Sequence, residues 1–104
     1  MYHRAFKMQL FPGFELEYQK RHDEIWPELQ VLLKQAGVSD YSIFLDEATG
    51  VLFGVMKAED PLKLTHLREH PVMKKWWEYM SDIMETNDDN SPAQVQLKTM
   101  FYLP

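Results

Sequence analysis

The segment from Asp40 to Glu59, DYSIFLDEATGVLFGVMKAE, constrains the fold of this chain more than any other stretch. It contains two runs rich in β-branched and aromatic residues, and the loop DEATG between them ends at Gly50. Two such runs around a short glycine-containing loop are typical of an antiparallel β-hairpin. The sequence therefore predicts two neighbouring strands in the middle of the chain.

The residues before the hairpin predict one strand and one long helical region. Residues 3–11, HRAFKMQLF, alternate apolar and polar side chains, which is the pattern of a strand with one buried face. Residues 14–36 have helical spacing, and Gly37 is suited to end the helix in a left-handed conformation. Pro27 lies inside this region and removes a backbone donor, so we expect a kink or a restart there.

The residues after the hairpin repeat this arrangement in reverse order. Residues 61–70 predict a short amphipathic helix with Asp60 as its N-cap, and a second helix is predicted to begin at Pro71. Residues 85–92, ETNDDNSP, are dense in turn-forming side chains. Residues 95–104, VQLKTMFYLP, predict a last strand.

The predicted order of elements is strand, helix, strand, strand, helix, strand, which is the order of a ferredoxin-like split β-α-β fold. In this α+β fold, helices cover one face of an antiparallel sheet. Phe44 and Phe53 point to the other face, because successive side chains of a strand alternate. We expect a second copy of the chain to cover that face, which would give a homodimer with a dimeric α+β barrel. At 104 residues the chain has material for one core, so a single domain over residues 1–104 is expected.

Composition excludes several classes of function. The net charge of -5 disfavours a nucleic-acid partner, because affinity for nucleic acid comes largely from Lys and Arg. The absence of cysteine excludes a disulfide framework and a thiolate nucleophile. Neither a secretory signal nor a membrane span is recognisable, so a soluble cytoplasmic protein without a membrane partner is expected.

Tyr18 and His22 are the first candidates for a functional site. They are four residues apart and so share one face of a helix, the face that is expected to point inward. One interpretation is that both are core residues with satisfied hydrogen bonds. The other is that they line a polar cavity, where a histidine that titrates near neutral pH can exchange protons with a ligand.

Trp76 and Trp77 are the second candidates. Successive helical side chains diverge by about 100°, so one indole is expected in the core while the other lines a wall. Plain packing explains both equally well. Indoles beside a histidine and tyrosines are nevertheless what a monosaccharide site uses, and Tyr41 opens a strand that could add another hydroxyl.

No metal site is expected. His66 and His70 flank Glu69 in the order of an inverted zincin, but Pro71 ends the helix and no third ligand is evident. Both histidines are expected to be exposed helix residues. Lys20, Arg21, Lys74 and Lys75 likewise have the pattern of exposed helix charges.

Five motifs together resemble the L-rhamnose mutarotase family over essentially the whole chain: YQKRHDEIWPEL, VSDYSIFLD, PVMKKWWEYM, NDDNSP and MFYLP. The resemblance implies a dimeric α+β barrel enzyme that interconverts the α and β anomers of L-rhamnose without a cofactor. It implies that His22 is the proton donor, here hypothesised to protonate the ring oxygen. It also implies that the sugar-contacting residues are Tyr18, Tyr41, Trp76 and Trp77. Some members have a tryptophan where this chain has Leu64.

Two alternatives remain open at this point. A haem-degrading or quinone-type monooxygenase can have the same barrel architecture, and a non-catalytic dimer that binds small molecules would use the Tyr18–His22 pair only for packing. Anomer exchange, ligand binding without exchange, and a haem absorption band would distinguish the three.

Overall fold

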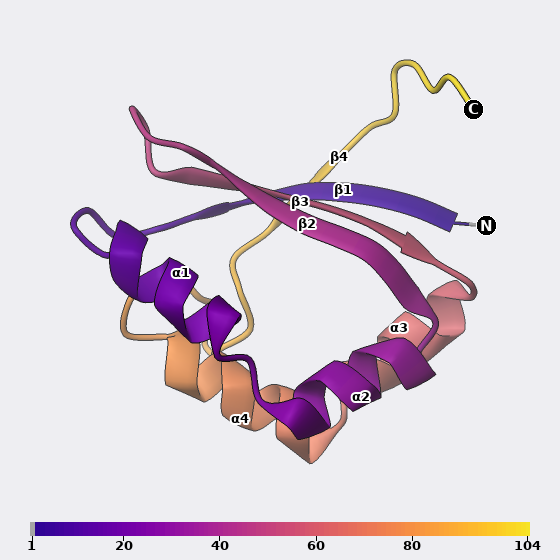
Figure 1. Cartoon of the computed structure of the whole chain (residues 1–104), viewed down its shortest axis with the longest axis horizontal. Helices are drawn as coiled ribbons and strands as arrows, with labels where there is room; N and C mark the ends of the chain where they lie inside the picture. Colours follow the sequence, from indigo (N-terminus) through magenta and orange to yellow (C-terminus); the bar gives the residue numbers. More distant parts are fainter. Residues whose placement is uncertain (1) are drawn as a thin grey trace.

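The structure is a computed structural model that describes residues 2–104, and Figure 1 shows its course. Within this range the elements are β1 (Tyr2–Gln9), α1 (Glu15–Asp23), α2 (Pro27–Gln35), β2 (Val38–Asp46), β3 (Val51–Ala58), α3 (Pro61–Leu67), α4 (Pro71–Met80) and β4 (Val95–Leu97). The predicted order is confirmed: the helical region before the hairpin is present as two helices, and both helices predicted after the hairpin are present. No helix among these residues is both long and apolar enough to cross a membrane.

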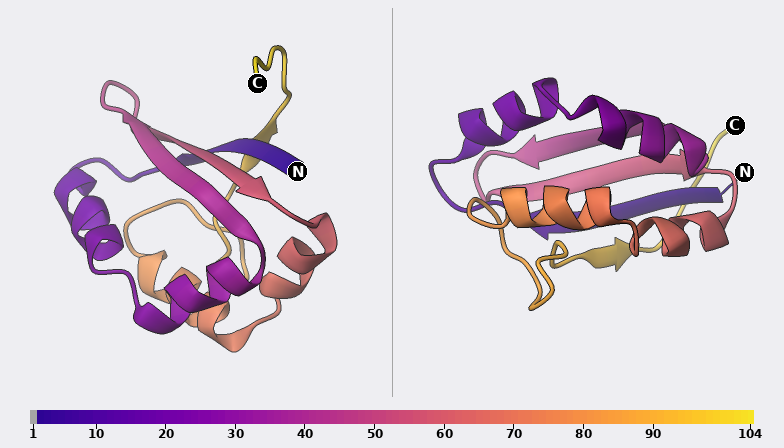
Figure 2. Two further views of the ribbon diagram at one scale, coloured as in Figure 1. Left: turned by 45° about the vertical axis from the view of Figure 1, so that its right-hand side comes forward. Right: turned by 90° about the horizontal axis from the view of Figure 1, so that it is seen from below.

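The four strands form one antiparallel sheet in the order β2-β3-β1-β4. The predicted hairpin is confirmed as β2 and β3, and Gly50 at its turn has a φ of +76°, which a glycine adopts without strain. All four helices lie on one face of the sheet (Figures 1 and 2). The α+β class predicted from the order of elements is therefore confirmed.

The break between α1 and α2 has a local cause. A helix continued through Pro27 would lose one hydrogen bond and crowd the carbonyl of Asp23. Trp26, which precedes this proline, is extended with φ -59° and ψ 131°, as residues before proline usually are. Pro27 then occupies the first turn of α2, where its missing N–H costs nothing. Gly37 follows α2 with a φ of +81°, as predicted.

Proline also separates α3 from α4. Asp60 caps α3 by accepting a hydrogen bond from the Leu62 N–H at 2.9 Å, which confirms the predicted N-cap. α3 ends at Leu67, three residues earlier than the predicted end at residue 70, because Pro71 holds His70 in an extended conformation. α4 then begins at Pro71, as predicted.

The core lies between the sheet and the helices. The alternation predicted for β1 is confirmed, since Phe6, Met8 and Leu10 are buried against the helical layer. Leu29 of α2 and Leu52 of β3 are buried with them. Side chains of the opposite sheet face remain accessible: Phe44 is 60% exposed and Val55 is 44% exposed. The sheet thus has one buried face and a second face on which the rest of residues 2–104 leaves apolar side chains exposed.

The prediction of a last strand over residues 95–104 is wrong for most of its length. Only Val95–Leu97 pair with β1, and residues 98–104 have no regular structure. The four consecutive side chains from Met100 to Leu103 are apolar and exposed. A strand alternates its side chains, so this run would need apolar cover on both faces of the sheet, and one chain supplies it on one face only. The segment instead leaves the sheet (Figure 1).

Candidate active site

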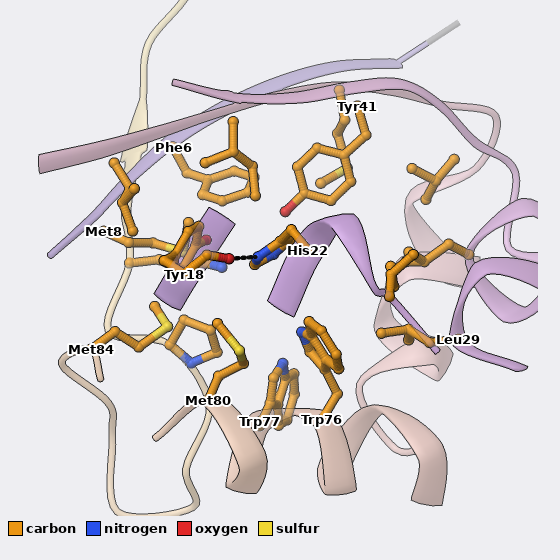
Figure 3. A pocket seen from close by; sticks show the side chains of 18 of the residues that line it. Phe6, Met8, Tyr18, His22, Leu29, Tyr41, Trp76, Trp77, Met80 and Met84 are labelled. Carbon is orange, nitrogen blue, oxygen red and sulfur yellow. Dashed lines mark hydrogen bonds between the residues drawn. The ribbon is translucent and has the colours of Figure 1, made fainter. Parts of the chain in front are cut away.

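A cavity of about 920 Å³ lies between the sheet and the helices, and Figure 3 shows it from close by. All five side chains that the sequence proposed for a site line it: Tyr18, His22, Tyr41, Trp76 and Trp77. They come from three elements, because α1 carries the first two, β2 carries Tyr41 and α4 carries the two indoles. A cavity of this size has room for a monosaccharide.

His22 is held by Tyr18 in two ways. Its ring stacks on the phenol ring, with 4.3 Å between centroids and 29° between planes. Its Nδ1 lies 3.1 Å from the Tyr18 carbonyl oxygen one helical turn earlier. A carbonyl only accepts, so Nδ1 donates a proton in this bond, and Nε2 keeps a free lone pair. The i to i+4 spacing read from the sequence is therefore what fixes the tautomer.

Burial decides the charge of this imidazole. Desolvation lowers the pKa of His22 below its ordinary value of 6.5, and the bond to the Tyr18 carbonyl opposes this in part. His22 is therefore neutral at neutral pH. A neutral imidazole whose Nε2 is unprotonated is ready to accept a proton from a hydroxyl in the cavity.

Tyr41 lies on the sheet side of the cavity, opposite α1. Its hydroxyl points toward His22 (Figure 3). The edge of its ring meets Phe6, with centroids 6.2 Å apart and an interplanar angle of 68°. Tyr41 as a whole is 38% exposed, but desolvation of its hydroxyl raises the pKa of Tyr41 to about 12, so this hydroxyl is protonated at neutral pH. Burial also raises the pKa of Tyr18, with a further contribution from Tyr41.

Trp76 and Trp77 both line the cavity, which corrects the expectation that only one of them would. Both are buried, at 7% and 8% exposure. The two indoles rise from α4 side by side with their nitrogens toward His22 (Figure 3). Although successive side chains of a helix diverge by about 100°, the cavity is wide enough for Trp76 and Trp77 of α4 both to border it. Trp76 meets the imidazole edge to face, with centroids 5.5 Å apart.

Behind these residues lies an aromatic cluster that the sequence did not reveal. Trp26 packs edge to face on Trp76, with 5.1 Å between ring centroids. The centroid of the Tyr79 ring lies 5.6 Å from that of Trp26 and 5.6 Å from that of Trp76. The guanidinium of Arg21 covers the Tyr79 ring at 4.3 Å and pairs with Asp82 at 2.8 Å. Its side chain is only 11% exposed, so the prediction of an ordinary exposed charge is wrong for Arg21.

Apolar side chains complete the cavity wall. Met8, Met80 and Met84 stand on one side of it (Figure 3), and Leu64 of α3 contributes to another part. Leu64 is buried at 7% exposure and belongs to the cavity wall.

The other histidines lie outside the cavity. His66 and His70 are exposed, as the sequence favoured. His70 caps α4, because its Nδ1 accepts a hydrogen bond from the Val72 N–H at 3.1 Å. Across residues 2–104, no group of three metal-ligating side chains comes together.

Comparisons with known proteins point to one family. The family model described as L-rhamnose mutarotase matches residues 3–103. An L-rhamnose mutarotase from Rhizobium leguminosarum bv. trifolii is 61% identical over 100 residues, which cover 96% of this chain and 94% of that protein. The crystal structure of an L-rhamnose mutarotase from Formosa agariphila superimposes with a TM-score of 0.92, at 45% identity and complete coverage of both chains.

A more distant likeness concerns the fold alone. The crystal structure of an antibiotic biosynthesis monooxygenase superimposes with a TM-score of 0.54 at 11% identity, covering 96% of this chain and 99% of that one. The architecture is thus shared with proteins whose sequences have little in common with this one.

Proposed function

Because the chain belongs to the L-rhamnose mutarotase family, we propose that it interconverts the α and β anomers of L-rhamnose in the cavity between α1, α4 and the sheet. The reaction is an isomerisation by acid–base opening and closure of the sugar ring. One observation carries the proposal beyond the family match: a neutral imidazole faces an aromatic-walled cavity with its Nε2 lone pair free.

Ring opening needs two proton movements at one carbon. The anomeric hydroxyl loses its proton, the ring oxygen gains one, the bond between the anomeric carbon and the ring oxygen breaks, and an aldehyde forms. Rotation about the bond between C1 and C2, followed by closure on the opposite face, gives the other anomer. Neither a redox centre nor a covalent bond to the protein is needed for this sequence of steps.

The proposed role of His22 follows from its tautomer. Neutral His22 takes the proton of the anomeric hydroxyl on Nε2 during opening and returns a proton to the same oxygen during closure. The hypothesis from the sequence was that His22 gives a proton to the ring oxygen. Such a donor would have to be an imidazolium before the reaction begins, and burial disfavours that charged form. The donor role implied by the family resemblance is kept in the closing half of the reaction.

The aromatic side chains are proposed to hold the sugar. The C–H faces of a pyranose pack on indole rings, and N–H or O–H groups bond its hydroxyls. Trp76 and Trp77 supply both features, and Tyr18 and Tyr41 each direct a hydroxyl-bearing ring at the cavity. Holding the open chain in a conformation that can close again lowers the entropic part of the barrier.

We also propose that the active protein is a homodimer formed through the outer sheet face. The support is the group of exposed apolar side chains on that face, where Phe44, Val55, Val95 and Leu97 remain between 39% and 60% exposed. Sedimentation equilibrium tests it, since Phe44→Glu should shift the distribution toward monomer. The single domain, the cytoplasmic location and the absence of a cofactor stay predictions from the sequence.

The test of the proposed function is saturation-transfer NMR on the anomeric protons of L-rhamnose. The parent protein should accelerate exchange between the two anomers. His22→Gln, which keeps the polar volume but cannot carry a proton, should reduce the rate by on the order of a hundred- to ten-thousand-fold. His66→Gln makes the same change at an exposed histidine of α3 and should leave the rate unchanged.

Binding of the sugar without accelerated exchange would contradict the proposal and favour a binding protein. A His22→Gln variant that folds and exchanges anomers at the parental rate would contradict the role of the imidazole while leaving the activity in place.

A further inference from the structure

One imidazole cannot perform both proton movements of ring opening at the same moment. Nε2 is the only free nitrogen of His22, because Nδ1 donates to the Tyr18 carbonyl. While Nε2 accepts the proton of the anomeric hydroxyl, it has none to give to the ring oxygen. A second group that carries a proton at neutral pH must therefore face the same carbon from another direction.

The cavity walls narrow the choice of that group. The carboxylates that reach the cavity, Glu15, Asp23, Asp40 and Glu47, and the ammonium group of Lys34 all belong to exposed residues. Arginine guanidinium groups do not release protons in proteins. Among the buried or inward-facing proton carriers, this leaves the phenols of Tyr18 and Tyr41.

Position separates the two phenols. Tyr18 stacks on the imidazole, so its hydroxyl approaches a bound sugar from the same side as His22. Tyr41 comes from the sheet, and its hydroxyl points across the cavity at His22 (Figure 3). A ring held between them would have imidazole on one side and phenol on the other. Arg4 lies close enough to oppose the rise in the pKa of Tyr41, and it would also stabilise a transient phenolate.

A β-bulge is what turns Tyr41 inward. Ser39 pairs with Lys57 and Ser42 pairs with Val55, so β2 advances three residues while β3 advances two. Regular alternation from buried Val38 would send Tyr41 to the outer face of the sheet. The extra residue reverses this, and bulges are often found where a strand re-aims a side chain beside an active site.

Asp40 bears the conformational cost of this bulge. Its φ of +49° lies in the left-handed region, which aspartate tolerates better than most residues. Its carboxylate pairs with Lys57 of β3 at 3.2 Å. An irregularity kept in this way beside a cavity is a reason to look for a function in the residue it re-aims.

We infer that Tyr41 is the second proton-transfer group of the reaction and that the bulge at Asp40 positions it; the inference rests on the proposed mutarotase function. In opening, His22 Nε2 takes the proton of the anomeric hydroxyl and the Tyr41 hydroxyl gives its proton to the ring oxygen. The C1–O5 bond breaks and the C1–O1 double bond forms, leaving imidazolium, phenolate and the free aldehyde. Closure on the opposite face returns the O5 proton to Tyr41 and the imidazolium proton to O1.

The first test compares Tyr41→Phe with Tyr2→Phe by anomer-exchange NMR over a range of sugar concentrations. Tyr2→Phe removes the same atom from an exposed end of β1 and should behave as the parent. Tyr41→Phe should lower kcat by on the order of a hundred-fold or more with KM changed by less than about fivefold. A kcat within about tenfold of the parent would overturn the inference. A parent protein that does not accelerate exchange would instead overturn the proposed function on which it rests.

A second measurement separates proton transfer from simple hydrogen bonding. Replacing Tyr41 with 3,5-difluorotyrosine keeps the hydroxyl but makes the phenol more acidic. The alkaline limb of the kcat profile should then move to lower pH, because the phenol must be protonated to act as the acid in opening. The same replacement at Tyr2 should leave the profile unchanged. An unshifted limb at position 41 would overturn the assignment.

The bulge is tested with two variants of Asp40. Asp40→Asn keeps a residue that tolerates positive φ, whereas Asp40→Val places a β-branched residue where it is strongly disfavoured. Asp40→Val should lower kcat, and adding Tyr41→Phe to it should lower kcat little further, because both changes remove the same group. The separate variant Asp40→Asn should keep kcat within a few-fold of the parent value. Equal kcat in the valine and asparagine variants, or full additivity in the double variant, would overturn the positioning role.

Discussion

Gly54 on β3 gives the sharpest stability prediction that the structure allows. It faces Phe6 across the sheet, and the Phe6 ring lies over the place where a side chain at residue 54 would begin. A Cβ added at Gly54 would stand 2.4 Å from Cζ and 2.5 Å from Cε2 of that ring. This is about 1 Å short of an ordinary carbon–carbon contact. Phe6 is 1% exposed, so its ring can relieve the overlap only by moving into the cavity.

The expected size follows from two opposing effects of Gly54→Ala. Overpacking of a filled core costs about 1–3 kcal/mol. Replacing glycine by alanine inside a strand recovers roughly 0.5–1 kcal/mol of backbone entropy. The net loss should be about 1–2 kcal/mol, which corresponds to a fall in Tm of roughly 4–16 °C for a domain of this size. Because the displaced ring supports Tyr41, kcat should fall as well.

The assay is a double-mutant cycle with Phe6→Leu, measured by thermal unfolding at one fixed protein concentration. Leucine is shorter than phenylalanine and leaves room for the added methyl group. In the Phe6→Leu background, Gly54→Ala should therefore be neutral or stabilising by up to about 1 kcal/mol. If Gly54→Ala costs the same in both backgrounds, or costs nothing in the parent, then contact with the Phe6 ring is not what requires glycine here.

Four further predictions concern the site and its support. The acid limb of kcat/KM should have its midpoint below 6.5 because burial lowers the pKa of His22, and His22→Gln should abolish this limb. Because the pKa of His22 is lowered in the folded state, the unfolded protein binds more protons than the folded protein at pH values below 6.5. The Tm should therefore fall as the pH is lowered below 6.5, and it should fall less in His22→Gln. Trp76→Leu should raise KM about tenfold in the exchange assay with a smaller effect on kcat, since it removes a flat packing surface for the sugar. Arg21→Ala should lower the free energy of unfolding by about 1–2 kcal/mol in a denaturant titration, through loss of the Tyr79 contact, whereas Asp82→Asn should cost under about 1 kcal/mol because that carboxylate is 65% exposed.

Features that depend on neighbours along the chain could be predicted from the sequence. Alternation in β1, the hairpin and the restart at Pro27 all follow from local rules, and the structure confirms them. The shared face of Tyr18 and His22 follows from helical spacing in the same way. Whether that face meets a cavity or dry core depends on how far the helices stand from the sheet, which no local pattern records.

Features that depend on distant partners escaped prediction. Arg21 reads as an exposed charge because its partner Asp82 lies 61 residues away in the sequence. The inward direction of Tyr41 depends on a bulge at Asp40. An aspartate in a strand sequence does not by itself predict a positive φ. The end of β4 at Leu97 depends on which sheet face is covered, and the composition of residues 98–104 favours a strand regardless.

The break before Pro27 has a consequence for how such an enzyme changes its substrate. An uninterrupted helix from residue 14 to residue 36 would be straight over roughly 35 Å and would pack along the sheet for its whole length. Two shorter helices joined at an angle can stand away from the sheet, so the angle between them determines how large a sugar fits in the space between helices and sheet. A change in the segment between α1 and α2 would then alter the size of the cavity while every group that touches the sugar stays the same. Such a change is a route to new sugar substrates that leaves the proton-transfer chemistry intact.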